Sequence, residues 1–135
     1  MALRILKNRG FARAADKDGL TDQALCTAVA EIEAGLIDAR LGGFLLKKRI
    51  RRGGRGKSGG FRTIAAYRRQ DRLVFLYLFA KHERDNITEK ERTALSEIGD
   101  QYIRLSASKL EELVTNGILT EVAFDDRDED EPNPG

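Results

Sequence analysis

The run Leu73–Ala80 restricts the fold more than any other feature of the sequence. Its eight residues, LVFLYLFA, are apolar or aromatic and do not alternate with polar ones. A short continuous apolar run predicts a central β-strand that is covered on both faces. Crossing a bilayer takes about 20 residues, so the run is too short for a membrane span.

The segment Phe61–Arg68 predicts the neighbouring strand, joined to the first by a hairpin turn at Arg69–Asp71. Its alternation places Arg62 and Arg68 on one face and the aromatic side chains on the other. We expect the aromatic face to be covered and the arginine face to be open.

Helix signals dominate the first third of the chain. The apolar residues there recur at helical spacing, as Leu25, Ala28, Val29 and Ile32. Thr21 or Asp22 can cap the first turn of this helix, and Gly35 stands where a C-terminal cap is expected. A shorter helix over Phe11–Lys17 and a first strand at Ala2–Leu6 are expected before it.

Two capping boxes mark the C-terminal part. Thr88 and Glu91 can satisfy each other's free N–H groups at the start of a long helix. The apolar stripe of that helix comprises Leu95, Ile98, Tyr102 and Leu105. Ser108 with Glu111 repeats the pattern and predicts a short last helix.

The remaining segments complete a single predicted domain over residues 1–124. Phe44–Arg52 alternates imperfectly and predicts a strand, Gly53–Gly60 a flexible loop, and Ile118–Phe124 an edge strand. The acidic segment Asp125–Gly135 contains two prolines and predicts a disordered tail.

Composition excludes several classes of protein. The lone Cys26 cannot form an internal disulfide, and a single cysteine with a single histidine is too few for a typical zinc site. The N-terminus lacks the charged-then-apolar pattern of a secretory signal. We therefore expect a cytoplasmic protein without a membrane partner, a metal or another cofactor.

Charge is distributed unevenly along the chain. Residues 47–72 contain eleven lysines and arginines against one acid, Asp71, for a charge of +10, whereas residues 125–131 carry −5. Glycines in the 53–60 loop allow a backbone to approach a phosphodiester, and basic residues neutralise it. This block predicts a polyanionic ligand, with nucleic acid as the leading class.

A second group of polar residues, Lys81–Asn86, follows the predicted central strand. Loops at strand ends commonly carry catalytic groups on a rigid scaffold. His82 is the only histidine, and histidine is the side chain best suited to proton transfer near neutral pH.

Two runs carry a resemblance to a known family. Gly56–Ile64 reads GKSGGFRTI, and Val74–Ile87 reads VFLYLFAKHERDNI. The chain resembles the RelE/HigB toxins of bacterial type II toxin–antitoxin systems, and most closely the HigB-like branch, with its "GKSGG-aromatic-R" and "FAK-x-x-R-x-N-I" signatures. Ala34–Ile37 and Leu41–Gly43 also match, so the likeness extends over about residues 1–123.

The resemblance implies a compact α+β fold. Its N-terminal helices would pack on one face of a small, mostly antiparallel sheet, with a basic cleft on the other face and a C-terminal helix. It also implies an endoribonuclease that cuts mRNA on the ribosome without a metal, by attack of a ribose 2′-OH on the adjacent phosphate. The implied partners are mRNA, the ribosome and a cognate antitoxin of the helix-turn-helix, HigA-like kind, with DNA contacted only through the antitoxin complex.

The resemblance also assigns roles to residues. Arg62 would bind the phosphate, and the cluster of Lys81, His82 and Arg84 would complete the catalytic site. His82 replaces an arginine of RelE, and Thr88 replaces a functional tyrosine, so the base and acid stay open among Lys57, Lys81 and His82. The residues expected to bind RNA are Lys47, Lys48, Arg49, Arg51, Arg52, Arg55 and Arg68.

Two alternatives differ in mechanism. A ParE-like protein uses the same scaffold to poison DNA gyrase without cleaving RNA, and the two quoted runs argue against it. A non-catalytic RNA- or DNA-binding module would depend on total charge and on no single residue. Mapping cleavage of ribosome-bound mRNA separates the three functions.

Overall fold

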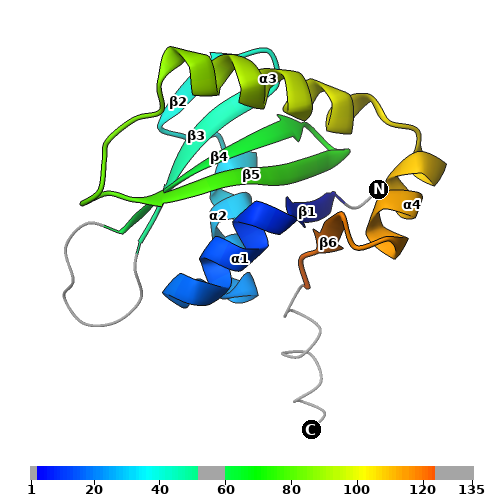
Figure 1. Cartoon of the computed structure of the whole chain (residues 1–135), viewed down its shortest axis with the longest axis horizontal. Coiled ribbons are helices and arrows are strands. Elements are labelled where there is room, and N and C mark those ends of the chain that lie inside the picture. The colour runs from blue at the N-terminus through cyan, green and yellow to red at the C-terminus, as the bar shows by residue number, and fades with distance from the viewer. Residues whose placement is uncertain (1–2, 52–59, 124–135) are drawn as a thin grey trace, which may run out of the picture.

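The computed structural model describes residues 3–51 and 60–123 (Figure 1). Within these ranges the elements follow in the order β1 (Arg4–Asn8), α1 (Arg9–Asp18), α2 (Asp22–Glu33), β2 (Ala39–Gly42), β3 (Leu45–Ile50), β4 (Phe61–Arg68), β5 (Arg72–Ala80), α3 (Glu89–Arg104), α4 (Ala107–Thr115) and β6 (Leu119–Glu121). The predicted glycine loop falls largely, and the predicted acidic tail entirely, outside the described residues.

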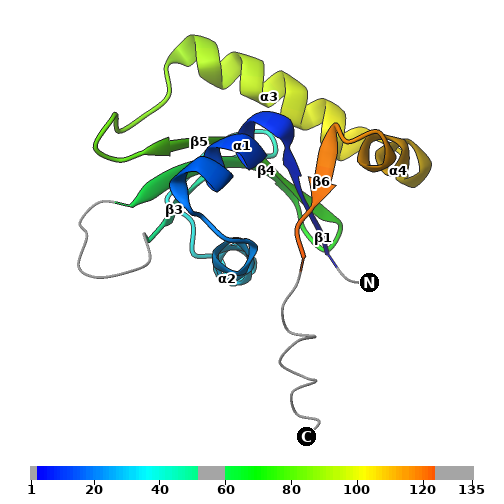
Figure 2. The ribbon, with the colours of Figure 1, turned by 60° about the horizontal axis from the view of Figure 1, so that its bottom comes forward.

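The strands form one sheet in the order β2-β3-β4-β5-β1-β6. β1 pairs with β5 in parallel, and the other neighbours are antiparallel. Helices α1 and α2 cover one face, and α3 and α4 pack against the other (Figures 1 and 2). This confirms the α+β class and the N-terminal helical layer.

The apolar run that predicted a central strand lies in β5, between β4 and β1. Every β5 residue is buried except Tyr77, which is half-buried. Phe75 faces α1, where its ring lies 4.9 Å from the ring of Phe11. Val74 and Leu76 belong to the cluster on the opposite face. Cover on both faces explains why the strand has no polar alternation.

The prediction that β4 has an open arginine face is wrong. Phe61 through Ala66 are all buried, and Arg62 is only 7% exposed. Ile64 and Ala66 alternate with Arg62 and belong to the cluster beneath α3 and α4. The face that carries Arg62 is therefore apolar in its middle, and α3 covers it there.

The layer of α1 and α2 follows the predicted pattern. The spaced apolar residues of α2 are buried, and the Thr21 hydroxyl accepts a hydrogen bond from the Ala24 N–H at 3.1 Å. Gly19 ends α1 with a φ of 74°, a left-handed conformation that glycine adopts without steric cost.

For α3 and α4, the structure differs from the sequence prediction in two details. The Thr88–Glu91 capping box is present, but the fully covered residues of α3 are Gly99 and Ile103 rather than the predicted stripe, which flanks them. A Cβ at Gly99 would lie 3.0 Å from the Ala66 side chain, so a larger residue here would require α3 or β4 to shift by a few tenths of an ångström. Helix α4 is capped by Ser106, not Ser108.

The sheet edges differed most from the prediction. The short strand β2, which pairs with β3, was not predicted, and β6 is shorter than the expected edge strand. Among the described residues, no helix is long and apolar enough to cross a membrane.

Candidate functional site

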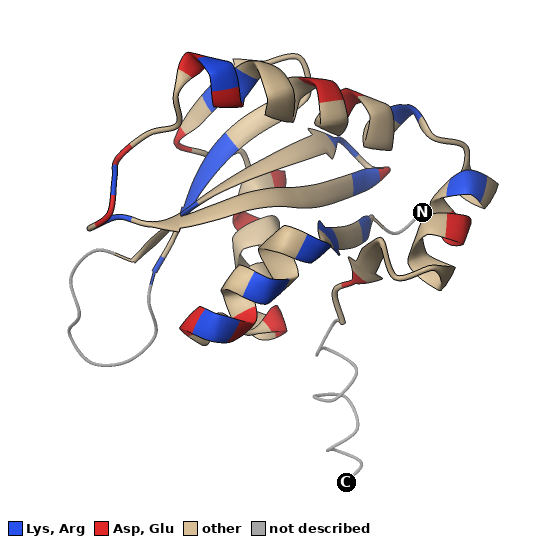
Figure 3. Cartoon of the chain, viewed as in Figure 1, with Lys and Arg blue, Asp and Glu red and all other residues tan. Residues whose placement is uncertain are grey.

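A polar pocket lies on the face of the sheet that carries α3. Its lining comes from β3, β4, the segment before β2 and the segment after β5, and comprises Asp38, Lys47, Arg49, Arg62, Lys81, Asp85 and Asn86. Arg49 lies opposite Arg62 in the β3–β4 ladder, and Arg62 lies opposite Phe79 in the β4–β5 ladder. Figure 3 shows basic residues on β3 and mixed charges along the segment after β5.

Arg62 is the most deeply buried cation of this pocket. Its Nη2 lies 4.0 Å from Asp85 Oδ1, which is a long ion pair. Its Nη1 is buried and has no hydrogen-bond acceptor among the described residues. An unsatisfied buried donor costs about 1–3 kcal/mol, and more when it is charged. Arg62 therefore brings to the pocket a buried guanidinium with one donor that no described residue satisfies.

The other cations are held more loosely. Arg49 Nε lies 3.8 Å from Asp38 Oδ2, and the Arg49 side chain is largely exposed. Lys47 Nζ donates a hydrogen bond to Asn86 Oδ1 at 2.8 Å. Lys81 is exposed, and its backbone N–H donates to Gly60 O at 3.0 Å, which continues the β4–β5 pairing. Three exposed or partly exposed cations thus surround the buried one.

Arg84 does not line the pocket. Its guanidinium forms an ion pair with Glu91 of α3 and lies 5.2 Å from the Phe79 ring centroid and 5.7 Å from that of Tyr77. The hydrogen bond to Glu91 raises the pKa of Arg84. The backbone N–H of Thr88 and then Arg84 lower the pKa of Glu91. Arg84 therefore anchors the 81–88 segment to α3.

His82 does not line this pocket. His82 is exposed in the turn after β5, and no described residue forms a hydrogen bond with it. Lys57, Arg52 and Arg55 lie outside the described residues. Of the two predicted base or acid candidates that the structure describes, Lys81 lines the pocket and His82 does not.

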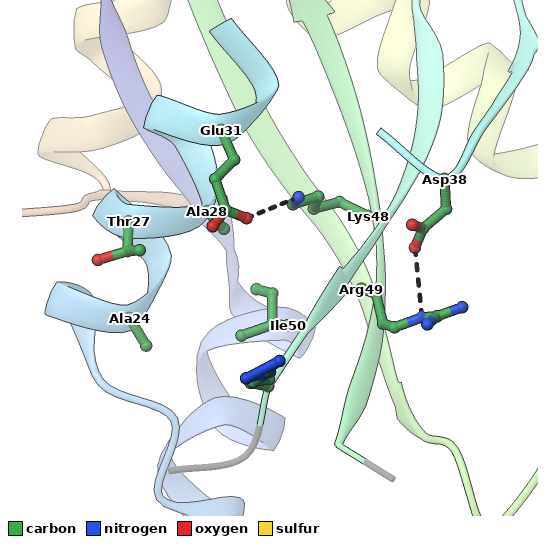
Figure 4. A pocket seen from close by; sticks show the side chains of 9 residues that line it. Ala24, Thr27, Ala28, Glu31, Asp38, Lys48, Arg49 and Ile50 are labelled. Atoms are coloured by element: carbon green, nitrogen blue, oxygen red, sulfur yellow. Dashed lines mark ion pairs between the residues drawn. The ribbon is translucent and has the colours of Figure 1, made fainter. Parts of the chain in front are cut away.

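The predicted RNA-binding residues are divided between two faces and two ends of the sheet. Lys48 points toward α2, where its Nζ lies 2.7 Å from Glu31 Oε1, whereas Arg49 points away toward Asp38 (Figure 4). Arg68 pairs with Asp71 at the hairpin turn, at the opposite end of β4 from Arg62. Arg51 is exposed at the end of β3 and lines pockets on the α2 side.

Two acidic residues of the pocket were missed from the sequence. Asp85 lies inside the quoted KHERDN run, so its position was noted but its role was not. Asp38 comes from the segment before the unpredicted strand β2, and no motif marked it.

Comparison with known families assigns the chain to a family. The model of the RelE toxin of the RelE/RelB toxin–antitoxin system matches residues 3–122. The chain belongs to the RelE toxin family. This RelE-family protein is thus the toxin of a toxin–antitoxin system, and a cognate antitoxin is its partner. Toxins of the family generally inhibit translation and are generally endoribonucleases. A search of curated proteins finds no match to the chain.

Proposed function

We propose that this RelE-family toxin is a ribosome-dependent endoribonuclease that cleaves mRNA without a metal. The observation that supports it best is the buried Arg62 side chain, which lines a cationic pocket and whose Nη1 donor has no acceptor among the described residues. A phosphate oxygen would supply the missing acceptor, and guanidinium–phosphate hydrogen bonds are among the strongest in proteins.

The proposed reaction needs three functions. A base accepts the proton of the ribose 2′-OH, whose oxygen attacks the adjacent phosphorus. Arg62, with Lys47 and Arg49, stabilises the negative charge that develops on the phosphate oxygens. An acid donates a proton to the 5′-oxygen as its bond to phosphorus breaks, which leaves a 2′,3′-cyclic phosphate. Lys57, Lys81 and His82 remain the candidates for base and acid.

The partners and boundaries are also part of this proposal. The toxin domain spans residues 1–124 and is followed by the acidic tail. We place the protein in the HigB-like branch, in the cytoplasm, with a helix-turn-helix antitoxin of the HigA-like kind. A neighbouring gene should then encode a small protein that co-purifies with the toxin and restores growth to cells that express it.

The decisive experiment maps mRNA cleavage on programmed ribosomes by primer extension. Arg62→Gln should lower the cleavage rate by about 100-fold or more, because it removes a charge-stabilising donor from the transition state. Arg68→Gln is the matched control, since Arg68 lies on the same strand but at the hairpin end, paired with Asp71. It should retain cleavage to within about 3-fold, because Arg68 does not line the pocket and its partly exposed ion pair contributes little to stability.

The result separates the remaining functions. Cleavage should persist in the presence of a chelator and should require ribosomes. Equal losses in both arginine variants would favour a non-catalytic binding module. Inhibition of growth without any mRNA cleavage would favour a gyrase poison. Because Arg62 is buried, thermal unfolding of each variant must accompany the activity measurement.

A further inference from the structure

Lys47 is held in the pocket by a neutral partner. It lies on β3 opposite Ile64 and shares the pocket with Arg49 and Arg62. Its Nζ donates to the amide oxygen of Asn86 at 2.8 Å. An ammonium has three N–H donors, and an amide oxygen carries no net charge. The contact therefore orients the ammonium without neutralising it and leaves donors for a ligand.

Two cations outside the pocket lining contact a carboxylate directly, whereas the carboxylate partners of Arg49 and Arg62 inside it lie 3.8 and 4.0 Å away. Lys48 pairs with the carboxylate of Glu31, and Arg84 pairs with that of Glu91. The first ion pair connects β3 to α2, and the second connects the segment after β5 to α3. Lys47 thus contacts a neutral amide, whereas the cations that join the sheet region to a helix pair with carboxylates.

We propose that Asn86 is a positioning residue, which aims the Lys47 ammonium into the pocket while keeping its charge available to an RNA phosphate. The inference rests on the proposed function, because it concerns how the same pocket binds its substrate. It adds that the amide at position 86, rather than a carboxylate, is required for binding.

A purely structural role makes the opposite prediction. If Asn86 only pinned the 81–88 segment to β3, a carboxylate would do so at least as well, because charge-assisted hydrogen bonds are stronger. Asn86→Asp would then preserve both stability and activity. Under the proposal, the new carboxylate pairs with Lys47 and withdraws its charge from the phosphate.

The test measures single-turnover cleavage of mRNA on programmed ribosomes against toxin concentration, together with thermal unfolding. Asn86→Asp should reduce cleavage efficiency by about 10-fold, the effect of losing one phosphate contact, with an unchanged or higher Tm. Asn86→Ala removes the hydrogen-bond acceptor of Lys47 but adds no negative charge. The cleavage efficiency of this variant should therefore fall by only about 3-fold, while its Tm should fall because the hydrogen bond is lost. Activity and stability should therefore rank the two variants in opposite orders.

Two controls separate the Lys47 contact from simple repulsion of RNA. Asn116→Asp makes the same substitution at the end of α4, outside the pocket, and should not change cleavage. In a Lys47→Ala background, Asn86→Asp should cause no additional loss, because the side chain it would neutralise is absent. Repulsion of RNA by the carboxylate itself would persist in that background.

Each outcome decides between the two proposals. An unaltered protein that cleaves no mRNA overturns the proposed function. Cleavage by the unaltered protein with full activity of Asn86→Asp overturns this inference alone. So does a loss in Asn86→Asp that remains undiminished when Lys47 is alanine. The expected opposite ranking, abolished in the Lys47→Ala background, supports it.

Discussion

Adjacent residues of β3 carry the same charge into different environments. Lys48 is 7% exposed on the α2 face, where Glu31 neutralises it and the Leu36 carbonyl accepts a second hydrogen bond at 2.9 Å. Lys47 faces the other side of the sheet, where its partner is the neutral amide of Asn86. Lys48 thus connects a helix to the sheet, whereas Lys47 has no carboxylate partner among the described residues.

This difference shows that the basic block of residues 47–72 is not one continuous surface. Arg68 and Arg72 both contact Asp71 at the hairpin turn, and Arg72 also donates to the Tyr102 carbonyl at 2.8 Å. Arg72 thus links the sheet to α3, whereas the partly exposed Arg68 pairs with the turn residue Asp71. Among the described residues of the block, the cations that line one pocket are Lys47, Arg49 and Arg62.

The largest effect that tests this comparison is on cleavage. Lys47→Ala should reduce mRNA cleavage efficiency by about 10-fold, because it removes a phosphate-binding cation. Lys48→Met, the matched change on the opposite face, should alter it by less than about 2-fold in protein that remains folded. Primer extension on programmed ribosomes measures both. A larger loss in Lys48→Met than in Lys47→Ala would reverse our assignment of the two faces.

The next effect is on stability, which should depend more on Lys48 than on its neighbour Arg49 on the pocket face. Lys48→Met should lower the free energy of unfolding by about 1 kcal/mol, because the Leu36 carbonyl and Glu31 lose their donor. Arg49→Ala should change it by less than about 0.5 kcal/mol, since its ion pair is long and exposed. Urea unfolding with constant m-values is the measurement. Equal destabilisation by both substitutions would contradict the distinction.

The smallest effect concerns how the stability contributed by the Arg84–Glu91 ion pair depends on pH. Hydrogen bonds from Thr88 and Arg84 lower the pKa of Glu91 below its ordinary value of 4.5. The ionised carboxylate therefore stabilises the folded state above pH 4.5, and this contribution is lost as the pH falls through the lower, folded-state pKa. Glu91→Gln should be less stable than the unaltered protein at pH 7, with the gap closing in acid. Thermal unfolding from pH 7 to pH 3 should show this convergence, and a constant gap would contradict it.

Local patterns predicted most elements correctly. The spacing of Leu25 and Ile32 identified the buried side of α2, and the Thr88–Glu91 box identified the start of α3. Such signals depend on residues within one or two turns of each other, so they can be read from the chain. The cap of α4 was misplaced by two residues, because Ser106 and Ser108 both offer a suitable hydroxyl.

The candidate site was only partly predictable. The motifs marked the region of Arg62, Lys81 and Asn86, which the structure brings together in one pocket. They did not reveal Asp38, whose proximity to Arg49 arises only when the segment before β2 reaches β3. Nor could the motifs show that Arg84 pairs with Glu91 and does not line the pocket.

By itself, the sequence determined a central apolar strand, the capped helices, a concentrated positive charge and the motifs of a RelE-type toxin. Only the tertiary structure decided that α3 covers the middle of β4, that Arg62 is buried, and that Lys48 pairs with a carboxylate whereas Lys47 contacts an amide. Alternation along a strand shows that neighbouring side chains point to opposite faces. Which face is covered, and which cation meets a carboxylate, depends on helices that are distant in sequence and reach the sheet only in the folded protein.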